Sequence, residues 1–231
     1  MGTTFADLEE RVKTVQREVA EAAVSNGRDP SEVTIVAVCK TAPREAVDAA
    51  VDLGLRHFAE NRVQDALQKF ENPLPPGCDL HLIGHLQTNK ARPAVGLFDV
   101  IESVDRPSLI TALEKEAARI EKRIPVLVQV NIAGEEQKAG CAPDEAYELL
   151  AALTSSAWLE PQGFMTMAPL VADPEEARPV FRGLRELRDR LQEQFADVPL
   201  PVLSMGMSND YPVAISEGAT LVRVGRAIFG G

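Results

Sequence analysis

Short apolar runs alternate with longer amphipathic stretches along almost the whole chain. The first run, residues 33–39, is continuously apolar and rich in β-branched residues, which is typical of a strand buried on both faces. Seven further runs have a similar character. The eight runs predicted to be strands are residues 33–39, 56–60, 80–84, 100–103, 126–132, 161–166, 202–205 and 220–224.

The stretches between these runs have a helical spacing of apolar residues. Helices are predicted at residues 44–53, 62–70, 88–97, 107–123, 143–155, 174–195 and 211–218. A further helix precedes the first strand, with Thr4 and Asp7 as its capping residues and Asn26-Gly27 at its end. We find no linker or change in composition. Eight strands alternating with helices favour an α/β fold, a single-domain (β/α)8 TIM barrel over residues 1–231 with an extra N-terminal helix, rather than an open doubly wound sheet.

The composition narrows the class of protein. With 45% hydrophobic residues, 26% charged residues and a net charge of −11, the chain is expected to be globular and to avoid nucleic acid and anionic membranes. It contains no apolar segment of signal-peptide or membrane-spanning length. Three cysteines without a close pair are expected to be reduced thiols, which favours a cytoplasmic location.

Lys40 follows the first predicted strand directly. In a (β/α)8 barrel the functional groups gather at the carboxyl ends of the strands, where a lysine amine can be desolvated and act as a nucleophile. On position alone, an ordinary solvated lysine is the commoner case. The chain nevertheless places other polar or glycine positions at the same expected end, among them Asn61 and His85.

The segments after the seventh and eighth strands favour a phosphate site. Barrel enzymes often bind phosphate with these two loops, and Gly206 and Gly225 would let the backbone approach an anion. Ser204 or Ser208 would add a hydroxyl, although a simple helix cap and tight turns explain the same residues. Arg223, within the eighth strand, either lies between helix and sheet or points inward as a permanent cation. A strand-end lysine, a phosphate cradle and an inward arginine together suggest pyridoxal phosphate.

Other candidate groups carry less weight. His81 and His85 have the spacing of metal ligands on a helix, but they lie on a strand and its exit, so we predict no metal site. The carboxylates of Glu60, Glu102 and Asp105 are expected to form a solvated rim. Cys39 is expected to be a core thiol, because strand alternation turns it away from Lys40.

Ordered motifs from the first strand to the last resemble the YggS/PROSC family, the pyridoxal phosphate homeostasis proteins. The segments that carry the resemblance are residues 36–41, 59–64, 81–90, 103–105, 129–131, 203–210 and 222–225. The resemblance implies a barrel like the N-terminal domain of alanine racemase, with pyridoxal 5′-phosphate as the cofactor. It further implies an imine on Lys40, Asn61 near the ring, Arg223 at the pyridine nitrogen and phosphate contacts around the remaining site residues, namely Ser204, Met205, Gly206, Gly225 and Arg226.

Two positions depart from the family pattern. Ala59 replaces a common glycine, and Arg226 replaces a common serine or threonine, which removes a hydroxyl while the backbone amide remains. The resemblance implies a carrier or regulator in vitamin B6 homeostasis, without established catalysis, and apo-forms of pyridoxal phosphate enzymes as partners. A small amino-acid racemase is the alternative, but neither Tyr147 nor Tyr211 has a clear route to a cofactor. We expect a monomer.

Overall fold

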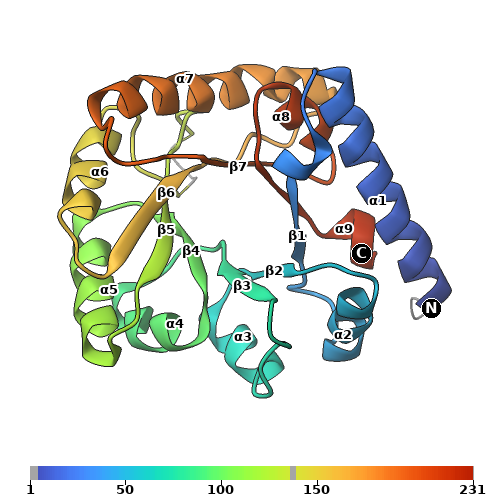
Figure 1. Ribbon diagram of the computed structural model, residues 1–231, viewed down its shortest axis with the longest axis horizontal. Helices are drawn as coiled ribbons and strands as arrows, with labels where there is room; N and C mark the ends of the chain where they lie inside the picture. Colours follow the sequence, from blue (N-terminus) through green and yellow to red (C-terminus); the bar gives the residue numbers. More distant parts are fainter. Residues whose placement is uncertain (1–4, 136–138, 231) are drawn as a thin grey trace.

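Eight parallel strands close into one barrel in chain order. The computed structural model describes residues 5–135 and 139–230. Each strand pairs with its neighbours in sequence, and β1 pairs with β8 to close the ring (Figure 1). The strands are β1 (Thr34–Val38), β2 (His57–Glu60), β3 (Asp79–Leu82), β4 (Val100–Val104), β5 (Ile124–Gln129), β6 (Leu159–Met165), β7 (Val202–Met207) and β8 (Leu221–Val224). The predicted (β/α)8 barrel is confirmed.

Helices surround this barrel, as Figure 1 shows. They are α1 (Phe5–Ser25), α2 (Arg44–Asp52), α3 (Val63–Lys69), α4 (Ala91–Leu97), α5 (Pro107–Ile120), α6 (Ala146–Thr154), α7 (Arg178–Gln194), α8 (Tyr211–Ser216) and α9 (Arg226–Phe229). The short 3-10 helices are η1 (Pro30–Glu32), η2 (Thr88–Lys90) and η3 (Pro174–Ala177). Among the described residues, no helix combines the length and the apolar character that crossing a membrane requires.

The observed elements differ from the predicted ones mainly at their ends. The predicted helices over residues 88–97 and 174–195 each begin as a 3-10 turn, and the strand predicted to reach residue 132 ends at Gln129. The fifth helix ends before Glu121, which has a left-handed backbone (φ 53°). Helix α9 and η1 were not predicted, because segments of three or four residues carry no helical period. The predicted cap at Thr4 lies outside the described residues.

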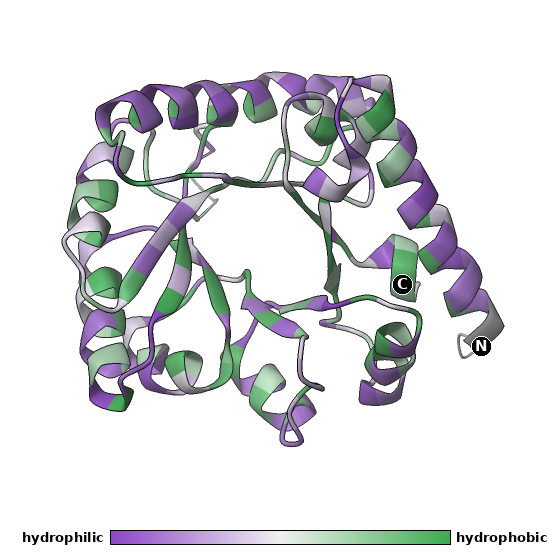
Figure 2. Cartoon of the chain, viewed as in Figure 1, coloured by the Kyte–Doolittle hydropathy of each residue, from purple (hydrophilic) through white to green (hydrophobic). Residues whose placement is uncertain are grey.

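The main apolar core lies between the strands and the surrounding helices. Its members come from both layers, whereas hydrophilic residues occupy much of the surrounding helices (Figure 2). The interior of the barrel is different. Four buried apolar residues are separate from that core, and their neighbours in the strand register include charged and polar groups. These four are Val36, Ala59, Leu127 and Met165.

Helix α1 is held against the last βα unit. The hydroxyl of Tyr211, at the start of α8, donates a hydrogen bond to the Glu18 carboxylate on α1. Arg28, just after α1, donates to the backbone carbonyls of Ile215 and Ala219 at 3.0 and 2.8 Å. The additional N-terminal helix therefore packs beside the junction where the barrel closes, since β8 pairs with β1 there.

One carboxylate near this junction collects three arginines. Glu217, at the end of α8, is 4% exposed and lies within 3.1 Å of Arg178, Arg182 and Arg185. Burial is the largest influence on the Glu217 pKa and acts to raise it. The hydrogen bonds from Arg182 and Arg178 and the charge of Arg185 outweigh burial, so the pKa lies below its usual range.

We predict that Glu217→Gln lowers the free energy of unfolding at pH 7 by about 1–2 kcal/mol, because the three arginines lose their shared carboxylate while solvent screens part of the loss. Because the Glu217 pKa is lower in the folded state, its carboxylate stabilises the fold at pH values above the unfolded-state pKa of about 4.3. This contribution is lost as the pH falls through the folded-state pKa. Urea unfolding should therefore show the difference from wild type shrinking below about pH 4. Glu186→Gln, on an exposed position of α7, is the matched control and should differ little at either pH. A gap that persists at low pH would contradict the electrostatic cause.

Candidate functional site

Lys40 lies at the carboxyl mouth of the barrel, two residues after β1 ends. It is exposed, and its neighbours are set by the strand register. Val38 pairs with Ala59 on β2, so continuing the register by two residues brings Lys40 beside Asn61. On the other side Ala37 pairs with Val224, which places Gly225 beside Val38. Asn61 therefore lies beside Lys40, and Gly225 lies on the neighbouring strand, two positions before Lys40 in the register.

Close backbone approaches hold the chain at Gly225 and at Asn61, on the two strands that flank β1. A Cβ atom on Gly225 would lie 3.0 Å from the Val38 carbonyl oxygen. A Cβ atom on Gly84, at the exit of β3, would lie 2.0 Å from the Asn61 carbonyl oxygen, which no side chain can tolerate. Glycine at these strand exits therefore lets the chain pack tightly around Lys40 and Asn61.

The segments after β7 and β8 are joined to each other by hydrogen bonds. Arg226 donates from Nη2 to Asn209 Oδ1 at 3.1 Å, and the Ala227 amide donates to Ser208 Oγ at 3.4 Å. Gly225 is the N-cap of the short helix α9. Loops after the seventh and eighth strands together with a short extra helix are the usual phosphate-binding arrangement in this fold.

Residues 205 and 206, for which phosphate contacts were expected, do not direct a side chain to the mouth. Met205 is fully buried in the apolar core on the helix side of the sheet. Gly206 has φ +92°, and a Cβ atom there would lie 2.6 Å from the Cβ of Ala214, so this glycine lets β7 pack closely on α8. Any contact that these two residues make at the mouth comes from the backbone.

Arg223 points into the barrel and is 3% exposed. Its Nη1 donates to Ser204 Oγ at 2.6 Å, and its Nη2 donates to the Thr166 carbonyl oxygen at 2.7 Å. Because Arg223 pairs with Val36, it lies two positions below Gly225 on the inner face of β8. Of the two orientations considered from the sequence, the inward one is confirmed.

A chain of hydrogen bonds continues from Arg223 across the interior. The Ser204 hydroxyl donates to one oxygen of Glu102, and the other oxygen lies 2.7 Å from His81 Nδ1. Burial acts most strongly on the Glu102 pKa and would raise it. The hydrogen bond and charge of His81, the charge of Arg223 and the Ser204 hydroxyl together hold the pKa below its usual range. Glu102 is thus a buried anion beneath a buried cation.

The predicted solvated rim of carboxylates is wrong for Glu60 and Glu102, because both are completely buried. Glu60 forms an ion pair with Lys69 of α3 at 2.6 Å, and Lys69 also donates to the carbonyl oxygen of Cys39. Asp105 is largely buried as well, beside Arg106 and His85. Pairing with a cation explains the burial of Glu60 and Asp105, whereas Glu102 is satisfied by Ser204 and His81; no single strand pattern shows either.

Cys39 is a buried thiol, as predicted, and packs behind Lys40. Its Sγ donates to the Ala59 carbonyl oxygen at 3.3 Å. Burial, reinforced by the negative charge of Glu60, raises the pKa of Cys39 to about 12. The thiol is therefore protonated at neutral pH. The sequence analysis missed Lys69, which contacts the peptide unit preceding Lys40; only its helical position facing β2 was available as a signal.

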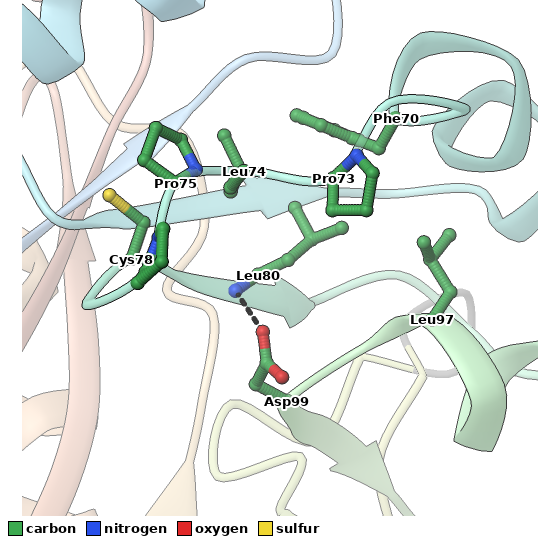
Figure 3. Close-up of a pocket in the computed structure, with 9 residues that line it drawn as sticks. Phe70, Pro73, Leu74, Pro75, Cys78, Leu80, Leu97 and Asp99 are labelled. Carbon is green, nitrogen blue, oxygen red and sulfur yellow. Dashed lines mark hydrogen bonds between the residues drawn. The ribbon is translucent and has the colours of Figure 1, made fainter.

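Two small pockets lie at different ends of the molecule. One of about 240 Å³ adjoins the mouth and is lined by residues that include Asn61, His85 and Lys90. The other, of about 250 Å³, lies beside the beginnings of β3 and β4 under the loop 73–76 (Figure 3). The backbone N–H of Leu80 donates a hydrogen bond to the Asp99 carboxylate there, and the other side chains drawn around the pocket are mostly apolar. This pocket is separate from the polar groups of the mouth.

Comparison with known proteins agrees with this geometry. Residues 16–231 match the family model for the N-terminal domain of alanine racemase. The pyridoxal phosphate homeostasis protein of Aquifex aeolicus is 40% identical over 96% of both chains. The structure of PipY from Synechococcus elongatus with pyridoxal phosphate bound has a TM-score of 0.84 and 35% identity, covering 96% of this chain and all of that one.

A more distant structural likeness concerns the fold alone. Alanine racemase from Clostridium difficile has a TM-score of 0.76 at 12% identity, and the match covers 96% of this chain and 57% of the racemase. The nearer relatives match over nearly their full length, with the same barrel and well above a third identity in the Aquifex case. This chain therefore belongs to the family of pyridoxal phosphate homeostasis proteins.

Proposed function

We propose that the protein binds pyridoxal 5′-phosphate at the carboxyl mouth of its barrel and carries or buffers it in vitamin B6 homeostasis. The observation that carries the proposal is the placement of Lys40 beside Asn61 at the strand ends, with Gly225 and the buried guanidinium of Arg223 on the neighbouring strand β8. The names of the relatives and the pyridoxal phosphate bound to PipY support it.

The residues at the mouth fit this cofactor. Pyridoxal phosphate supplies an aldehyde that an amine can bind covalently, and Lys40 presents an exposed amine at the mouth. The backbone of residues 225–227, joined to Ser208 and Asn209, would receive the phosphate. Inside, Gln129 Oε1 is buried without a hydrogen-bond partner among the described residues, in the same layer as Met165 and Ser204. The layer below the mouth therefore offers polar groups for the nitrogen and oxygen atoms of a heteroaromatic ring.

The departure at Arg226 changes the phosphate contact. The guanidinium bonds to Asn209 and so ties the two loops together, in place of the hydroxyl that relatives with serine or threonine would offer. Ser204 does not replace that hydroxyl, because its Oγ is already bonded to Glu102 and Arg223. We infer that backbone amides and the Ser208 hydroxyl hold the phosphate.

Several features favour a carrier over a racemase. Arg223 does not give up its proton, so a pyridine nitrogen facing it stays unprotonated and the ring is a weaker electron sink. Both tyrosines of the chain are engaged elsewhere, since Tyr211 bonds to Glu18 on α1 and Tyr147 packs against Phe195. Among the described residues, neither tyrosine is available as an acid or base opposite Lys40.

Lys69 is inferred to position Lys40. Its side chain is 12% exposed, and its ammonium bridges the Glu60 carboxylate and the carbonyl oxygen of Cys39, the residue before Lys40. This charge-assisted hydrogen bond fixes the peptide group between Cys39 and Lys40, and so fixes the backbone that carries the Lys40 side chain.

Pyridoxal phosphate added to the purified protein should give the visible absorption of the cofactor bound to an amine, and borohydride should fix it on the peptide that contains Lys40. In Lys40→Ala the band should disappear, because the amine that follows β1 is removed. Lys115→Ala, on an exposed position of α5, is the control and should retain the band. An unchanged band in Lys40→Ala would remove Lys40 from the site.

Replacement of Lys69 should weaken both stability and cofactor binding. Lys69→Met leaves the Glu60 carboxylate buried without its cation, for which a loss of about 3 kcal/mol is expected in urea unfolding. Cofactor affinity should also fall, measured at a temperature where the variant is folded. Glu60→Gln with Lys69→Met should recover stability without recovering affinity if Lys69 positions Lys40 through the Cys39 carbonyl. Full recovery of both would leave Lys69 with a purely structural role.

The carrier and racemase functions predict different outcomes for the loaded protein. A carrier should reactivate an apo-enzyme that depends on pyridoxal phosphate, and Lys40→Ala should not. Chiral analysis after long incubation with L-alanine should find the amino acid unchanged. Enzyme-like formation of D-alanine that Lys40→Ala abolishes would replace the carrier function by racemisation.

A further inference from the structure

A second cluster of ligand-type side chains lies at the opposite, amino-terminal end of the barrel. His57 is the first residue of β2 and Asp79 the first residue of β3, and the two are paired in the strand register. His81 follows two residues later on the same face of β3. The cluster is thus separate from the Lys40 mouth, which lies where these strands end.

The spacing of the donor atoms matches a metal site. His57 Nδ1 lies 3.3 Å from His81 Nε2 and 3.4 Å from Asp79 Oδ2. All three donor atoms lie within 4.8 Å of one another. Zinc bonds of about 2.0–2.1 Å in a tetrahedron put neighbouring ligand atoms roughly 3.3–3.4 Å apart. Two of the three separations therefore already have the required length.

A carboxylate behind the cluster fixes the orientation of one ligand. The Nδ1 of His81 lies 2.7 Å from Glu102 Oε1, and Glu102 is fully buried. A proton on Nδ1 directed at this carboxylate leaves the Nε2 lone pair facing His57. Carboxylate–histidine–metal arrangements use the same hydrogen bond to orient the ring and to make the ligand nitrogen more basic.

The cluster is also open enough to receive an ion. The His57 side chain is 32% exposed and that of Asp79 is 48% exposed, whereas His81 is 3% exposed. An ion can therefore enter from solvent and keep water in its remaining position. Two imidazoles and one carboxylate suit zinc and related transition ions better than magnesium or calcium, which prefer oxygen ligands.

We propose that His57, Asp79 and His81 form a binding site for one divalent transition-metal ion of the zinc class at the amino-terminal end of the barrel. The sequence predicted no metal site from the spacing of His81 and His85, and His85 takes no part in this cluster, because it lies by Asp105 at the other end. The two histidines that meet are 24 residues apart, on adjacent strands.

Zinc binding to the untagged full-length protein, stripped with a chelator, tests the site by competition with a chromophoric chelator. One ion per chain is expected, with at least tenfold weaker binding in His57→Ala and in Asp79→Asn. The chain has three histidines, so His85→Ala is a matched control and should bind zinc like wild type. Circular dichroism should show that each variant is folded before binding is compared.

Cys78 precedes Asp79 and lines the pocket in Figure 3, so its thiol is the alternative zinc ligand that the experiment must exclude. Cys78→Ser should therefore retain binding. Cobalt in place of zinc should show visible bands of a four- or five-coordinate ion without a thiolate charge-transfer band. No stoichiometric binding to wild type, equal binding in His57→Ala, or a loss confined to Cys78→Ser would overturn the proposal.

Discussion

The interior of this barrel depends on the hydrogen bonds that satisfy the buried carboxylate of Glu102. It accepts from the Ser204 hydroxyl on one side and lies against His81 on the other, while Arg223 donates to the same Ser204 hydroxyl. A guanidinium or a carboxylate alone in this interior would cost several kcal/mol. Because the two charges share a serine between them, each can be buried beneath the mouth without a direct ion pair.

The protein has an apolar core between strands and helices and a second, partly polar core inside the barrel. Barrels of this type usually fill their interior with layers of branched apolar side chains. Here the large apolar cluster lies between strands and helices and supplies most of the burial, whereas the interior holds a polar chain among a few apolar residues such as Leu127 and Met165. The outer core can therefore stabilise the fold while the inner residues are selected for chemistry.

The division also explains what the sequence could predict. Strands and helices follow from local periodicity, and the positions of Lys40, Asn61 and Gly225 follow from the rule that strand ends share one face of a barrel. The burial of Glu102 does not follow, because its serine partner lies 102 residues away. The meeting of His57 with His81 likewise depends on the register of two strands, which no local pattern contains.

The side chain at position 226 shows how the mouth tolerates change. If the phosphate is held mainly by backbone atoms, the site depends on how closely β8 approaches β1, and Gly225 sets that approach through its contact with the Val38 carbonyl. An arginine after Gly225 then alters only how the two loops are joined, through Asn209. Substitution at Gly225 would move the strand exit itself, and with it the spacing between Lys40 and the loops. The phosphate contact therefore depends on the backbone at Gly225, whereas the side chain at position 226 can vary.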